Sequence, residues 1–128
     1  MAFRVSKDEF SRIVEQALSG LPQQFQEFLE EVPVQIEMRP GKRMLRELGL
    51  ADDELLMGLY QGANLMNRSE LEGRGTPRPN HILIFQEDHE AICNKREDLV
   101  EEVRKTVLHE IGHHFGMSEA DLDDLGYG

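Results

Sequence analysis

The segment Leu99–Phe115 constrains the fold of this chain most strongly, because its apolar and polar positions repeat with the period of an α-helix. One face of this helix is apolar and spans about one quarter of the circumference; it consists of Val100, Val103, Val107 and Ile111. His109 and His113 fall nearly opposite, one helical turn apart. We expect a helix that begins after Asp98 as its N-cap, packs one face on the core and presents two imidazoles on another.

The two histidines have the spacing of metal ligands. Side chains four residues apart on a helix have Cβ atoms about 5–6 Å apart, so both imidazoles can bind one zinc ion. Glu110 completes the pattern His-Glu-x-x-His and projects beside the metal face. From there its carboxylate could accept a hydrogen bond from a zinc-bound water and take its proton. This spacing favours a zinc site with Glu110 as general base.

A third ligand is expected from just beyond the helix. Gly116 follows the helix at a position where a left-handed residue commonly ends the last turn. A reversal there would return Glu119 toward the metal, and three protein ligands with one open position are typical of catalytic zinc. Nearby acids are alternative ligands, although we expect them to be helix-start charges around a Ser118 N-cap; they are Asp121, Asp123 and Asp124.

The other candidate ligands are expected to have structural roles. His114 falls on the apolar side of the helix and is expected to be buried. His81 and His89 are expected to be surface or strand-edge histidines, and Cys93 to be a small buried residue.

The upstream pattern predicts two helices and three strands. Ser6 and Glu9 form a capping box for a helix that ends at Gly20, and a second helix runs from Leu21-Pro22 to Val32-Pro33. Strands are expected at residues 34–38, 54–62 and 81–85, with a turn-rich loop over residues 61–80. This order predicts one α+β domain over residues 1–128, with a small mixed or antiparallel sheet packed on helices and the metal-binding helix near the C-terminus.

Composition narrows the classes of partner. A formal net charge of −11 and a pI of about 4.8 disfavour nucleic acid and anionic membrane surfaces. The single cysteine excludes an intrachain disulfide and zinc frameworks with several cysteines, and it suits a reducing compartment. No apolar stretch approaches the length of a membrane span. We therefore expect a cytoplasmic protein.

The string His-Glu-x-x-His-x-x-Gly-x-x-Glu over residues 109–119, with "LLMGLYQG" upstream and "LGYG" at the end, resembles the small bacterial zincin-like metallopeptidase family. The resemblance covers nearly the whole chain. It implies a minimal zincin fold, Zn²⁺ held by His109, His113 and Glu119, and Glu110 as the base. Glu119 departs from the Asp that is more usual at its position.

The resemblance also implies a peptide or protein substrate, bound along an exposed strand edge. Residues 55–67 or residues 81–85 are the candidate edges. Because the groove of so small a domain is expected to be shallow, a partner protein could complete it. Two other functions remain open. One is a non-catalytic, zinc-stabilised binding module; the other is a zinc hydrolase acting on a non-peptide bond such as that of RNA, which the acidic balance disfavours.

Overall fold

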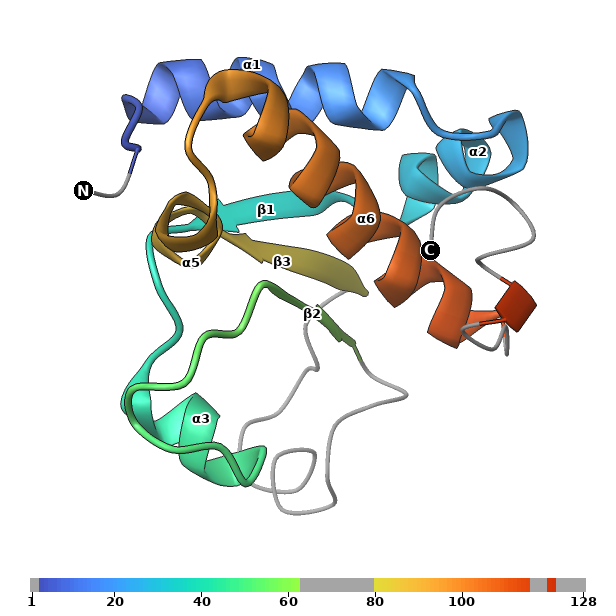
Figure 1. The fold of residues 1–128 in the computed structure, drawn as a ribbon. Coiled ribbons are helices and arrows are strands. Elements are labelled where there is room, and N and C mark those ends of the chain that lie inside the picture. Colours follow the sequence, from blue (N-terminus) through green and yellow to red (C-terminus); the bar gives the residue numbers. More distant parts are fainter. Residues whose placement is uncertain (1–2, 63–79, 116–119, 122–128) are drawn as a thin grey trace.

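In a computed structural model of the chain, which describes residues 3–62, 80–115 and 120–121, a small sheet packs against two long helices. These helices are α1 (Lys7–Ser19) and α6 (Arg96–His114). Figure 1 shows both on the same side of the sheet, with the short helix α3 (Lys42–Glu47) on the other side. The expected α+β class is confirmed.

The first two helices begin and end close to where the sequence indicates. At the start of α1 the Ser6 hydroxyl accepts a hydrogen bond from the Glu9 amide at 3.0 Å, as in a capping box. The apolar stripe of α1 is buried; it consists of Phe10, Ile13, Val14 and Ala17. Helix α2 (Gln23–Glu31) follows Pro22 and buries Phe25.

The sheet is mixed, with β3 (His81–Phe85) at its centre. The parallel neighbour is β1 (Val34–Glu37) and the antiparallel neighbour is β2 (Gly58–Gln61). All five residues of β3 are buried, which agrees with the apolar run in the sequence. Since β3 is paired on both sides, residues 81–85 cannot be the exposed substrate edge, and that alternative was wrong.

Strand β2 is shorter than the expected strand over residues 54–62. The strand comprises only four of those residues, and the Met57 carbonyl just before it accepts one further hydrogen bond from β3. The amide of Leu56 donates instead to the Asp88 carboxylate at 2.8 Å. The chain therefore leaves β3 before Met57, so the apolar run is longer than the strand.

Two short helices were not expected from the sequence. They are α3 and α5 (Gln86–Ile92), and neither has a side-chain hydrogen bond at its N-cap. Helix α5 begins directly after β3, with no turn residue between them. Because caps and separating turns are the local signals of a helix start, the formation of α5 depends on tertiary packing.

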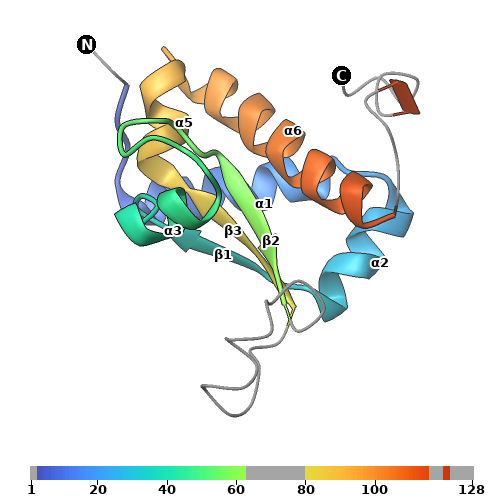
Figure 2. The ribbon, with the colours of Figure 1, turned by 90° about the horizontal axis from the view of Figure 1, so that it is seen from below.

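Helix α6 packs on the sheet through its expected apolar face, and Figure 2 shows it running alongside β2. Val103, Val107 and Ile111 are fully buried. The helix begins earlier than expected, at Arg96. Asp98 is therefore not the N-cap but a first-turn residue, whose carboxylate accepts a hydrogen bond from the Asn94 amide at 3.2 Å.

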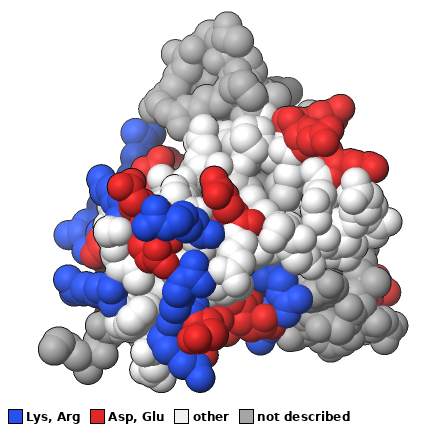
Figure 3. Space-filling view, turned by 90° about the horizontal axis from the view of Figure 1, so that it is seen from above, with Lys and Arg blue, Asp and Glu red and all other residues white. Residues whose placement is uncertain are grey.

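Charged side chains of both signs lie side by side on the face over α1 (Figure 3). Arg96 and Arg12 both pair with Glu9. The hydrogen bond from Arg96, followed by that from Arg12, lowers the pKa of Glu9. In the described ranges, no helix combines the length and the apolar character that a membrane span requires.

Two leucines at α3 offer a matched test of its packing. Leu45 is 2% exposed and Leu48 is 45% exposed. We expect Leu45→Ala to lower the free energy of unfolding by about 2–5 kcal/mol, and Leu48→Ala to lower it by less than about 0.5 kcal/mol. Urea denaturation of the two variants measures both values; equal losses would contradict the docking of α3 described above.

Candidate metal and catalytic site

The structure describes part of the expected metal site. The His109 side chain is half-buried, and His113 lies on the same helix by its backbone. The side chains of His113 and His114 lie outside the described part of the structure, as do three expected or alternative ligands, Glu119, Asp123 and Asp124. Asp121 is described and exposed.

Glu110 reaches the edge of the sheet. Its Oε1 accepts a hydrogen bond from the backbone amide of Tyr60 in β2 at 2.8 Å. The Phe85 amide donates to the Met57 carbonyl at 3.0 Å, which makes these residues a hydrogen-bonded pair of the antiparallel ladder. By alternation, the backbone groups of Gly58 and Tyr60 face away from β3. Glu110 therefore binds an amide on the open side of the edge strand.

The Tyr60 side chain points into the core rather than toward the metal face. It is 8% exposed, and its ring stacks on Phe28 with 6.4 Å between centroids. Burial raises the pKa of the phenol. Among the contacts of the described residues, the backbone amide of Tyr60 is the group that joins it to Glu110.

Gly58 brings α6 close to β2. A Cβ atom at this position would lie 2.6 Å from Cγ2 of Thr106 on α6 and 2.9 Å from the Leu83 carbonyl oxygen. The absence of a side chain at Gly58 thus lets α6 pack closely on β2. Thr106 precedes Glu110 by one helical turn, so this close contact lies next to the hydrogen bond between Glu110 and the Tyr60 amide.

His89 is fully buried, so the expectation of a surface or strand-edge histidine was wrong. Its Nδ1 lies 2.8 Å from the Phe85 carbonyl oxygen and must donate to it, since a carbonyl only accepts. Its Nε2 lies 2.9 Å from the Thr106 hydroxyl. Burial lowers the pKa of His89, and the hydrogen bond to Phe85 opposes the shift. His89 is thus a neutral link between α5 and α6.

His81 is also buried, at 3% exposure. The expectation of a surface or strand-edge histidine was therefore wrong for His81 as well. It begins the central strand, and its Nε2 lies 3.1 Å from the Gln61 side-chain oxygen. Cys93 is buried as expected. Burial is the main cause that raises the pKa of its thiol to about 11, so it is not poised as a thiolate ligand. Outside the undescribed segments, no three potential ligand side chains gather around one point.

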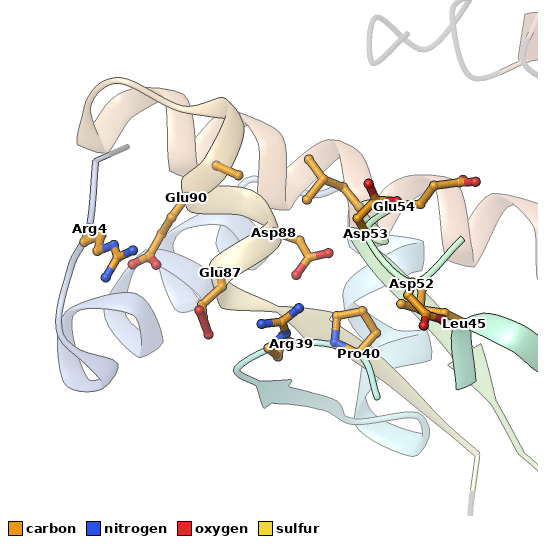
Figure 4. Close-up of a pocket in the computed structure, with 12 residues that line it drawn as sticks. Arg4, Arg39, Pro40, Leu45, Asp52, Asp53, Glu54, Glu87, Asp88 and Glu90 are labelled. Carbon is orange, nitrogen blue, oxygen red and sulfur yellow. The ribbon is translucent and has the colours of Figure 1, made fainter. Parts of the chain in front are cut away.

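A cavity of about 240 Å³ lies between α5 and the segment that precedes β2, and α6 does not line it. Figure 4 shows Arg39 beside Glu87 and Asp88, and Arg4 beside Glu90. Burial raises the pKa of Asp88, while the Leu56 amide opposes that shift. Two of its buried carboxylates, Asp88 and Glu90, accept backbone amides, and we assign the cavity no part in the metal site.

The sequence motif predicts Glu110 as the base, but it does not indicate the groups that contact Glu110 or position its helix. The Tyr60 amide carries no side-chain signal. Thr106 and His89 come together only through the packing of α5 on α6. One signal was present: Gly58 stands inside a strand pattern, where a glycine often marks the close approach of another backbone or element.

The model of a family described as zincin-like metallopeptidase matches residues 29–128. That range includes β1, β2, β3 and α6. No curated protein matches the chain.

The buried neutral His89 makes the stability of the fold depend on pH. Its pKa is lower in the folded chain than in the unfolded chain, where it is about 6.5. As pH falls through about 6.5, the unfolded chain binds a proton that the folded chain does not, so the free energy of unfolding decreases. We expect this decrease in urea denaturation of metal-free protein between pH 7.5 and 5.5.

The variant His89→Gln isolates this effect, since it removes the titrating group. It should be less stable than the parent at pH 7.5 and should lose stability less steeply on acidification. If both proteins show the same pH dependence, His89 does not titrate as described.

Proposed function

The chain belongs to the zincin-like metallopeptidase family, and on this premise we propose that it is a zinc metallopeptidase that uses Glu110 as its general base. The observation that carries the proposal is the position of the Glu110 carboxylate on the open side of the edge strand β2, next in sequence to His109. The base and the strand that would hold a peptide are thus in contact.

The residues of this chain fit a zinc ion. His109 leaves α6 half-buried rather than packed in the core, and His113 follows one turn later on that helix. These two imidazoles with the carboxylate of Glu119 form a donor set suited to zinc. A bound zinc ion supplies Lewis acidity, which acidifies water and polarises a peptide carbonyl.

The chain's own groups then account for binding and proton transfer. An extended peptide can pair with the outer side of β2, which is an edge strand of the sheet among the described residues. Glu110 at that edge takes a proton from the attacking water. The water oxygen bonds to the scissile carbonyl carbon, the C–N bond breaks, and Glu110 passes the proton to the departing amine. The Tyr60 amide holds one carboxylate oxygen during these steps.

A non-catalytic binding module is the second candidate, and one observation favours it. The Tyr60 amide is already engaged by Glu110, which leaves less of β2 for pairing with a peptide. A partner protein that completes the groove would offset this shortage. Because both candidate functions include bound zinc, metal content does not distinguish them. Casein cleavage by the parent and by Glu110→Ala does.

The sequence also supports proposals about the extent of the domain, its compartment and its class of substrate. We propose that the domain spans residues 1–128 and acts in a reducing compartment such as the cytoplasm, because the single cysteine offers no intrachain disulfide. The negative net charge favours a peptide over RNA as the substrate.

Replacing the base should remove hydrolysis but not zinc. We expect Glu110→Ala to retain the zinc content of the parent and to cleave fluorescein-labelled casein at least about 100-fold more slowly, the usual contribution of a general base. Glu97→Ala, at an exposed position of the same helix, is the matched control and should cleave at the parent rate. A Glu110→Ala protein as active as the parent, with both inhibited by chelator, would refute the mechanism.

Elemental analysis tests the third ligand. We expect about one zinc per chain in the parent, with loss of zinc on dialysis in Glu119→Ala and retention in Asp121→Ala. Since zinc binds the folded arrangement, EDTA should lower the melting temperature of the zinc-loaded parent. Zinc loss from Asp121→Ala alone would move the third ligand to Asp121.

A further inference from the structure

We propose that Gly58 is a positioning residue for Glu110. Because Gly58 has no side chain, Thr106 of α6 can lie against β2, and this places Glu110 within reach of the Tyr60 amide. The inference rests on the proposed function in one respect, namely that Glu110 is the general base.

The space at Gly58 is closed on two sides. A Cβ there would lie 2.6 Å from Cγ2 of Thr106 and 2.9 Å from the carbonyl oxygen of Leu83. The Leu83 oxygen belongs to the central strand and is held by the sheet. Carbon atoms pack at about 3.5–4.0 Å, so a methyl group would displace α6 from β2 by about 1 Å.

Thr106 is not free to turn away from such a methyl group. Its hydroxyl lies between two hydrogen-bond partners, the Glu102 carbonyl oxygen at 2.9 Å and Nε2 of the buried His89 at 2.9 Å. A β-branched side chain in a helix is also restricted at its first torsion. The helix, rather than the side chain, must therefore move.

A shift at Thr106 would be passed directly to Glu110. The two residues are four apart and lie on the same face of α6. The amide of Tyr60 and Oε1 of Glu110 are 2.8 Å apart, so an added separation of about 1 Å would exceed hydrogen-bond distance. Glu110 would then lose its hydrogen bond to the Tyr60 amide.

The test compares Gly58→Ala with Gly41→Ala in the zinc-loaded full chain. A Cβ at Gly41 would meet no heavy atom within 4 Å, so this variant is the matched control. The measurement is the hydrogen exchange rate of the Tyr60 amide divided by that of the Leu59 amide, followed by NMR. Leu59 lies opposite Leu83, and its amide faces β3 by alternation, so it reports general loosening of β2.

We expect the exchange ratio to rise at least about tenfold in Gly58→Ala, the effect of losing a hydrogen bond to a charged group. The ratio should stay at the parent value in Gly41→Ala and should rise by a similar factor in Glu110→Ala, which removes the acceptor. An unchanged ratio in Gly58→Ala overturns the proposal, and so does equal acceleration of both amides.

A second variant identifies Thr106 as the contact. Thr106→Ser removes Cγ2 but keeps the hydroxyl near His89. In the Gly58→Ala background it should return the exchange ratio at least about threefold toward the parent value. If the double variant has the same ratio as Gly58→Ala, α6 is not displaced through Thr106, and the proposal fails.

Zinc content and casein cleavage separate this inference from the proposed function. In Gly58→Ala we expect zinc per chain to be unchanged, kcat to fall by about 10- to 100-fold, as misplacement by about 1 Å predicts, and KM to stay within about twofold. Unchanged kcat with a raised exchange ratio would refute positioning. A parent protein that cleaves no substrate would refute the proposed function, while the exchange ratio would still decide whether Gly58 places Glu110.

Discussion

The hydrogen bond from the Tyr60 amide to Glu110 joins the two parts of this molecule that a hydrolytic site requires, an open strand edge and the helix with the expected metal ligands. An edge strand normally leaves its outward amides to water. Here one outward amide binds the carboxylate, and a charged acceptor makes such a bond stronger than a neutral one. The geometry of the site is therefore coupled to the distance between β2 and α6.

Helix α5 sets that distance through three consecutive buried residues, each of which contacts a different part of the chain. Asp88 accepts the Leu56 amide just before β2, and His89 lies against the Thr106 hydroxyl on α6. Glu90 accepts the Val5 amide ahead of α1. A seven-residue helix thus holds both sides of the Tyr60–Glu110 contact, although none of its own residues belongs to the expected metal site.

The elements that the sequence predicted are those with local signals. The Ser6 cap, the apolar run of β3 and the stripe on α6 each depend on residues close in sequence. Helix α5 has no cap, and its polar residues resemble those of a surface loop. Their burial depends on partners 17 to 85 residues away, from Thr106 for His89 to Val5 for Glu90. For the same reason the motif indicated Glu110 as the base but not the amide that holds it.

Burying Asp88, His89 and Glu90 in a small domain is costly unless each finds a partner. The structure meets this cost with backbone amides for the carboxylates and with a carbonyl and a hydroxyl for the imidazole. These directional contacts have narrow distance limits. Polar burial in α5 therefore adds to the restraint on the relative position of β2 and α6, on which the hydrogen bond between Glu110 and the Tyr60 amide depends.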